Sequence, residues 1–201
     1  MEKMKKNPYA FICDVETTGF SPVKNDIIQL AGIVVDLESH ETKSEFNEFC
    51  RPITPDSWGE GAERVHKISK QRAYGFQHPR KMGIKFLHFI KPYKTDDNLP
   101  LQFIFHAMGK FDWDFFRNTF RKVKLLNSIY KVFDDNHFES TITMANQYRS
   151  VTGLNSAKLN VLADHFNIKF NHHEALSDVY ATFEIWKIFK KMQHKQLDLN
   201  I

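Results

Sequence analysis

The distribution of apolar and polar residues predicts strands near the start of the chain and mostly helices after them. Apolar runs over residues 9–15 and 27–37 are typical of buried strands, and alternation over residues 42–51 predicts a third strand. A short apolar run at residues 101–106 predicts one more. Apolar side chains recur at helical spacing in residues 79–93, 111–126, 140–149, 158–166 and 174–193. This order favours one mixed α/β domain that opens with an antiparallel meander.

The segments between these elements carry residues that interrupt regular structure. Residues 52–68 contain two prolines and two glycines and predict a loop with one short helix. Ser140 stands where the N-cap of a helix is expected. We find no linker and no internal repeat. We therefore expect a single domain over residues 8–193, with a disordered basic N-terminus at 1–7 and a C-terminal tail at 194–201.

Composition narrows the class of protein without assigning a function. The chain has 201 residues, of which 42% are hydrophobic, and this suffices for one sizeable core. A formal net charge of +4 permits a polyanionic partner but does not require one. Cys13 and Cys50 are far apart and indicate a reducing compartment rather than a disulfide framework. No apolar run approaches the ~18 residues of a membrane span, so we expect a soluble, cytoplasmic protein with no membrane partner.

Two acids interrupt the first predicted strand. Asp14 and Glu16 are two residues apart, and side chains at that spacing in a strand point to the same side of the sheet. Burying two like charges costs free energy unless they are paired or bind a cation. Together these carboxylates suit one or two hard cations such as Mg²⁺ or Mn²⁺. The alternative is a surface-facing acidic pair on an edge strand, and the spacing alone favours neither interpretation.

Other acids lie near the starts of predicted helices. Asp178 belongs to the last helix and follows His173 by five residues. Five residues at ~100° each place two side chains about 140° apart, so His173 must precede the helix if both serve one site. Asp112 follows the strand at 101–106, at a strand-to-helix corner that suits the presentation of a ligand. A capping or solvated role is the alternative for each acid, and it is strongest for Asp114.

Taken together, the motifs resemble a known family. The sequence Asp14-Val15-Glu16-Thr17-Thr18-Gly19, then Phe111-Asp112, then His173-x-Ala175-x-x-Asp178 resembles the DEDDh branch of the DnaQ-like 3′–5′ exonucleases. The segment Val65-His66-Lys67-Ile68-Ser69 is similar to the His-Gly-Ile-Thr segment of that family. The likeness covers roughly residues 8–190. It departs from the family at Ala107, where an Asn usually follows the histidine, and in a stretch from His106 to Asp112 that is longer than in the bacterial proofreading type.

The resemblance implies a fold, a reaction and a set of site residues. The implied fold is ribonuclease H-like, with α-helices that flank a mixed central β-sheet. The implied reaction is hydrolysis of phosphodiesters at the 3′ ends of DNA or RNA, with single-stranded ends favoured and two divalent cations, Mg²⁺ or Mn²⁺, as cofactors. The implied metal ligands are Asp14, Glu16, Asp112 and Asp178, and His173 is the implied general base. The residues expected to bind substrate are Thr17, Thr18, Gly19, Phe20, His66 and Phe111.

Several alternatives stay open at this point. The same fold also serves in nucleic-acid-binding or polymerase-associated modules with weak or no catalysis, and an oligonucleotide phosphodiesterase is a third interpretation. The sequence does not choose between DNA and RNA, and a homodimer or an association with a polymerase stays open. Lys and Arg gather at Arg117, Arg121, Lys122 and Lys124. Such a run is more typical of a solvated helix face than of a binding patch.

Overall fold

A five-stranded sheet forms the centre of the computed structural model, which describes residues 6–96, 98–171 and 174–199. The strands are β1 (Tyr9–Thr17), β2 (Ile27–Asp36), β3 (Thr42–Phe49), β4 (Gln102–Phe105) and β5 (Phe138–Ser140). Their order across the sheet is β3-β2-β1-β4-β5. The first three strands pair antiparallel, whereas β4 and β5 extend the sheet with parallel pairing. The predicted meander is therefore confirmed, and β1 is the central strand.

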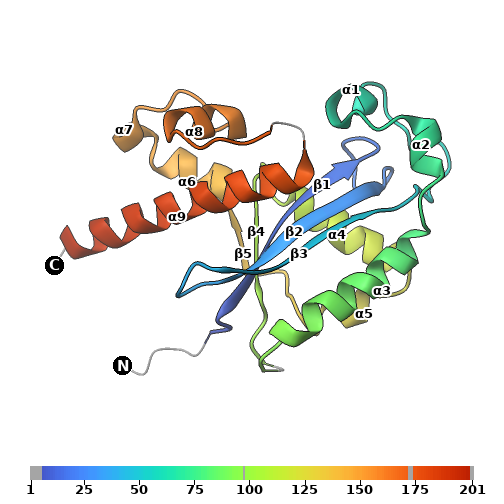
Figure 1. The fold of residues 1–201 in the computed structure, drawn as a ribbon, viewed down its shortest axis with the longest axis horizontal. Coiled ribbons are helices and arrows are strands. Elements are labelled where there is room, and N and C mark those ends of the chain that lie inside the picture. The colour runs from blue at the N-terminus through green and yellow to red at the C-terminus, as the bar shows by residue number, and fades with distance from the viewer. Residues whose placement is uncertain (1–5, 97, 172–173, 200–201) are drawn as a thin grey trace.

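Helices cover both faces of this sheet (Figure 1). In the described part of the chain they are α1 (Ala62–His66), α2 (Lys70–Tyr74), α3 (Pro79–Ile90), the 3-10 helix η1 (Lys91–Tyr93), α4 (Phe111–Lys122), α5 (Leu126–Ile129), α6 (Thr141–Gln147), α7 (Arg149–Thr152), α8 (Leu159–His165) and α9 (Ala175–Leu199). Figure 1 shows α9 along one side of the sheet, with α6 and α8 beside it. No helix of the described residues combines the length and the hydrophobicity that crossing a bilayer requires.

The two faces of β1 belong to two separate cores, because successive side chains of a strand point to opposite sides. The odd-numbered residues 11–15 join an aromatic-rich core with α3 and α4. Ala10 and Ile12 join the second core, which contains residues of α6, α8 and α9. Asp14 and Glu16 continue the even-numbered series and therefore lie on the side of the sheet that α9 covers.

Some boundaries differ from the sequence prediction for local reasons. The helix predicted over residues 111–126 is divided, because Lys124 adopts a φ of 60° and the Leu125 N–H donates to Phe120 O at 2.8 Å, which ends α4. Ser140 caps α6 as predicted and accepts a hydrogen bond from the Thr143 N–H. β5 has three residues, too few for a recognisable alternation. α9 continues to Leu199, into the segment predicted as a tail.

Candidate active site

Two carboxylates extend from the central strand of the sheet. β1 lies between β2 and β4, so the alternative of an acidic pair on an edge strand is wrong. Asp14 and Glu16 are each half-buried, on the side of the sheet that faces α9. Their strand neighbours on that face, Ala10 and Ile12, are fully buried apolar residues. The apolar series along this face of β1 thus ends in two acids at the C-terminal end of the strand.

The other two predicted acids reach the same region from two helices. Asp178 lies in the first turn of α9, next to Val179, which packs in the core shared with β1. Asp112 lies in the first turn of α4, the helix that follows β4, the parallel neighbour of β1. Asp112 is 4% exposed and Asp178 is 8% exposed, both low values for a charged residue. Three elements distant in sequence therefore place acidic side chains in one region of the structure.

The pKa values of these acids show that the groups influence one another. Burial raises the pKa of Asp14 well above its usual range, and Asp112, Glu16 and Asp178 each add to that rise. Burial also raises the pKa of Glu16 to about 7, with further contributions from Asp178 and Asp112. The pKa of Asp112 rises to about 7 through burial, although hydrogen bonds from backbone N–H groups, including that of Val15, oppose the change. Each ionised carboxylate thus makes ionisation of the others harder.

The donor chemistry of the site fits a hard divalent cation. The Oδ2 atom of Asp112 is buried without a hydrogen-bond partner in the described part of the chain, which is costly for a carboxylate unless a cation compensates it. Oxygen donors of this kind are the ligands that Mg²⁺ and Mn²⁺ prefer. As the residues that the structure describes are placed, no three His, Cys, Asp or Glu side chains are arranged closely enough to hold one metal ion. A cation would have to draw the carboxylates together.

His173 and its neighbour His172 lie outside the described residues. The predicted role of His173 as general base therefore stays a prediction. The chain just before it is tied to α9, because the Asn171 N–H donates to Ser177 Oγ at 2.7 Å. Asp178 is in helix α9, as the sequence predicted.

A cavity of about 480 Å³ opens beside Glu16. This volume is within the range of small-ligand sites. Five of the residues predicted to bind substrate line it, namely Thr17, Gly19, Phe20, His66 and Phe111. Thr18 does not line it. The Thr18 side chain is fully buried, and its backbone N–H and its hydroxyl are both bonded to the backbone of Asp26. Its role is to hold the turn rather than to face the cavity.

The turn after β1 is held closed by local hydrogen bonds. Thr17 Oγ1 donates to Gly19 O at 2.7 Å, and the Gly59 N–H donates to Thr18 O at 2.6 Å. A Cβ atom at Gly19 would lie 2.6 Å from the side chain of Asn25, so any larger residue would force that side chain to move. Phe20 follows, with 84% of its surface exposed at the rim of the cavity. This placement leaves an aromatic ring available to a ligand.

His66 forms part of the opposite wall. Its Nδ1 accepts a hydrogen bond from the Ile68 N–H at 3.0 Å, and its ring packs edge-on against Trp58. Burial lowers the pKa of His66, which favours the neutral ring. With Nδ1 as acceptor, the neutral ring carries its proton on Nε2, and this atom has no hydrogen-bond partner among the described residues. His66 thus keeps one buried, unpaired hydrogen-bond donor behind the surface of the cavity wall.

Sequence reasoning missed several residues of this wall. Asn25, Glu60, Ala62 and Val65 also line the cavity. Asn25 comes from the turn after β1, Glu60 from the loop before α1, and Ala62 and Val65 from the five-residue helix α1 itself, which is too short for periodicity to mark individual positions. The prolines and glycines of residues 52–68 were the available signal, and they indicated only that the segment is a loop.

The middle motif, in which Ala107 replaces the expected Asn, is anchored to α6. Ser140 Oγ donates to Ala107 O at 2.6 Å, and His106 Nδ1 lies 2.7 Å from Thr141 Oγ1. Burial lowers the pKa of His106 to about 4, so the ring is neutral near pH 7. These contacts fix the end of β4, from which the loop leads to Asp112.

Comparison with known proteins gives a family match and a fold. The RNase T family model, described as an exonuclease, matches residues 11–186. No curated protein sequence matches the chain. E. coli exonuclease I, in complex with a dT13 oligonucleotide, has a TM-score of 0.76 and 21% identity, over 95% of this chain and 43% of its own. An exonuclease I from Methylocaldum szegediense has a TM-score of 0.74 and 20% identity, over 93% of this chain and 41% of its own.

A product-bound exonuclease I is similar in the same way, with a TM-score of 0.75 and 19% identity, over 97% of this chain and 46% of its own. The chain thus spans less than half the length of each of these proteins. At such identities the likeness shows the fold alone. It confirms the predicted α/β architecture, a mixed sheet flanked by helices.

Proposed function

The chain belongs to the RNase T exonuclease family, and from that premise we propose that it is a metal-dependent enzyme that removes nucleoside 5′-monophosphates from the 3′ end of a single strand. Membership confirms the sequence resemblance to the DnaQ-like exonucleases and the predicted enzyme class. One observation carries the remainder of the proposal. Asp112 of α4 and Asp178 of α9 raise the pKa of both acids on β1, and one of these, Glu16, lines a cavity large enough for a nucleotide.

Four residues would hold the cations. Asp14 and Glu16 offer carboxylates from one side of β1, and Asp112 and Asp178 offer theirs from the first turns of α4 and α9. Members of the family generally use divalent metal ions, and Mg²⁺ or Mn²⁺ is our proposal for this chain. When bound, such ions activate a water molecule and stabilise the charge on the leaving oxygen.

The remaining residues would position the strand and move the proton. The closed turn at residues 17–19 would contact the terminal nucleotide, and the exposed ring of Phe20 would stack on its base. Nε2 of His66 is buried beside the same cavity and would donate to a sugar or phosphate oxygen once a bound nucleotide displaced the wall that covers it. We propose His173 as the general base that accepts the proton of the attacking water, because an ordinary histidine pKa near 6.5 suits this task at neutral pH.

These contacts imply little sequence preference. The proposed partners are carboxylates and cations at the phosphate, together with an aromatic ring at the base, and none of them distinguishes one base from another. The structure of E. coli exonuclease I holds a dT13 oligonucleotide, which makes single-stranded DNA the first substrate to test here.

The test is a panel of oligonucleotides labelled at either end, as DNA and RNA, single-stranded and duplex, with Mg²⁺ or Mn²⁺. A 5′ label should yield a descending ladder, and a 3′ label should appear at once as mononucleotide. Digestion from the 5′ end, or digestion that a chelator does not stop, would contradict the proposal. Binding of the strands without any release of mononucleotide would favour a nucleic-acid-binding module instead.

A further inference from the structure

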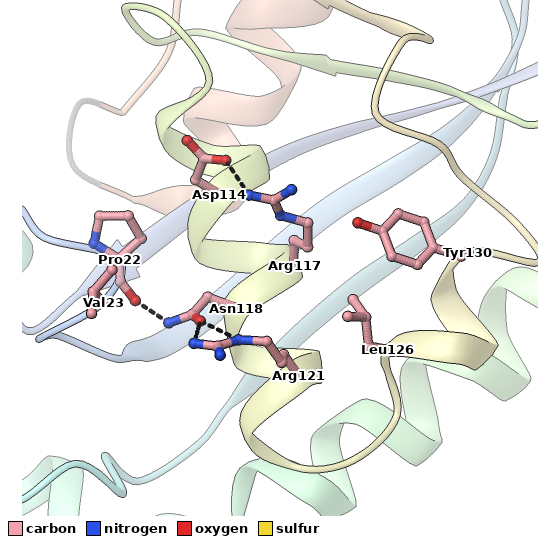
Figure 2. A pocket seen from close by; sticks show the side chains of 8 residues that line it. All are labelled: Pro22, Val23, Asp114, Arg117, Asn118, Arg121, Leu126 and Tyr130. Atoms are coloured by element: carbon pink, nitrogen blue, oxygen red, sulfur yellow. Dashed lines mark hydrogen bonds and ion pairs between the residues drawn. The ribbon is translucent and has the colours of Figure 1, made fainter.

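A second cavity, of about 390 Å³, lies between helix α4 and Pro22 and Val23, which follow the turn at residues 17–19 (Figure 2). Helix α4 forms its floor. Pro22 and Val23 line one side, and Leu126 and Tyr130 line the other. None of these residues belongs to the metal site or to the first cavity. The walls are therefore apolar or aromatic, while the floor carries charged side chains of α4.

Arg117, one of two arginines on this floor, is already neutralised. Its guanidinium lies 3.2 Å from Asp114 Oδ1 and 3.3 Å from Asp135 Oδ1. The hydroxyl of Tyr130 donates to the other oxygen of Asp135 at 3.0 Å. Arg117 and Tyr130 are thus joined through Asp135, and Arg117 offers little net positive charge to a ligand.

Arg121 differs, because its described partner is neutral. Its Nε and Nη2 donate to Asn118 Oδ1 at 2.9 and 2.5 Å, and Asn118 in turn donates to the carbonyl of Pro22. Asn118 is buried, whereas Arg121 is exposed. No carboxylate pairs with Arg121 among the residues that the structure describes. The amide therefore orients a guanidinium whose charge and remaining N–H donors are available to an anion.

Residues of α4 line both cavities. Phe111 lines the first cavity, and Asn118 and Arg121 line the second. Seven helical residues turn through ~700°, so Phe111 and Asn118 lie within about 20° of each other on the same face. The rise from Phe111 to Arg121 is about 15 Å. The segment 17–25 also supplies lining residues to both cavities, which therefore are neighbours along α4.

We propose that the second cavity binds the phosphodiester backbone of a single-stranded polynucleotide upstream of its 3′ end. Arg121 is the phosphate ligand, and Tyr130 offers a ring to a base or sugar. A stacked strand carries one phosphate per ~3.4 Å, so 15 Å corresponds to about four nucleotides. A guanidinium matches the geometry of a phosphate, and the exposed Val23 suits the less polar parts of a nucleotide. The assignment rests on the proposed exonuclease function.

The structure separates the members of the basic run formed by Arg117, Arg121, Lys122 and Lys124. Lys122 is bonded to Asp26 at 2.7 Å and anchors the turn after β1. Arg117 is bonded to two acids. Arg121 is the member of the run that lines a cavity with its charge uncompensated, which distinguishes it from Arg117 and Lys122.

The test compares Arg121→Gln with Lys81→Gln, an equal loss of charge on the exposed side of α3, away from both cavities. Substrates are a dinucleotide and a single strand of about 12 nucleotides, long enough to reach the second cavity. For Arg121→Gln we expect KM on the long strand to rise by roughly 5- to 10-fold, the worth of one charge-assisted contact at an exposed site. On the dinucleotide, KM should change by less than about twofold, because that substrate does not reach Arg121.

Binding supplies an independent readout. The dissociation constant of the long strand is measured in chelator, so that nothing is cleaved, and it should rise with Arg121→Gln. The slope of log Kd against log salt concentration should become smaller by about 0.7. Equal effects on both substrates, or effects no larger than those of Lys81→Gln, would overturn the assignment. If Arg121→Gln instead weakens the binding of an acidic peptide and leaves the binding of the oligonucleotide unchanged, the cavity serves a protein partner and the proposal fails. Absence of digestion by the wild type would refute the proposed function, while the binding comparison would still decide on Arg121.

Discussion

Replacing Glu16 with glutamine is expected to stabilise the metal-free protein while it removes a proposed cation ligand. Glu16 stands among Asp14, Asp112 and Asp178, and its ionised form is opposed by burial and by two of these neighbours. Glutamine keeps the shape of the side chain and removes the charge. A carboxylate whose ionisation costs folding free energy is expected at a site that a cation completes.

The pKa of Glu16 sets an upper limit on the gain. It rises from an ordinary 4.5 to about 7. At ~1.4 kcal/mol per tenfold change in proton affinity, full ionisation costs at most about 3.5 kcal/mol. Because Glu16 is partly exposed beside an open cavity, solvent screening lowers this figure, and we expect a gain of about 1–2 kcal/mol. For a protein of this size that corresponds to a rise in Tm of roughly 2–8 °C.

The gain must depend on pH in one direction. The pKa of Glu16 is higher in the folded than in the unfolded protein, so the folded state favours the protonated form. The cost of ionisation is absent below about pH 4.5, grows as the pH rises, and is complete above about pH 7. The advantage of Glu16→Gln should therefore be large at pH 8 and small at pH 5.

The assay is thermal or urea unfolding in chelator at both pH values. Glu38→Gln, which removes an exposed carboxylate from the β2–β3 turn, controls for net charge. Added Mg²⁺ should then stabilise the wild type more than Glu16→Gln, because a ligand that binds only the folded state raises its stability. If Glu16→Gln gains no more than Glu38→Gln at pH 8, or gains equally at pH 5, the reasoning from coupled carboxylates is wrong.

Three further predictions concern single positions. Asp112→Asn should lower kcat by at least ~10²-fold more than Asp114→Asn, because Asp112 is buried in the site whereas Asp114 contacts Arg117. Comparable losses of kcat in the two variants would contradict the assignment of Asp112 as the metal ligand. His173→Ala should slow hydrolysis by ~10²- to 10⁴-fold, the usual contribution of a general base, while added Mg²⁺ still raises the Tm of the variant. Turnover at the wild-type rate would exclude His173 as the general base. Gly32→Ala should destabilise the fold by about 1–3 kcal/mol in urea unfolding, because the new Cβ atom would lie 2.3 Å from Phe11 Cζ and 2.7 Å from Ile12 O. An unchanged urea midpoint would show that β2 can shift to accept the Cβ atom.

The sequence alone determined those features of the site that depend on near neighbours in the chain. Asp14 and Glu16 share a side of β1 because side chains alternate along a strand, and no tertiary contact is needed to know it. Ser140 caps its helix through a hydrogen bond to a residue three positions later. Asp178 belongs to a helix because the apolar spacing around it is local as well.

Only the tertiary structure decided how these pieces meet. That β1 is central, and that acids from α4 and α9 converge on it, follows from packing between residues far apart in the chain. Asp112 and Asp114 are ~200° apart on a helix, and the choice between them depended on which face of α4 the aromatic core buried. The same burial left Arg121 facing a cavity. Composition could not separate it from its basic neighbours, because a charge becomes available or neutralised only through the partners that folding brings to it.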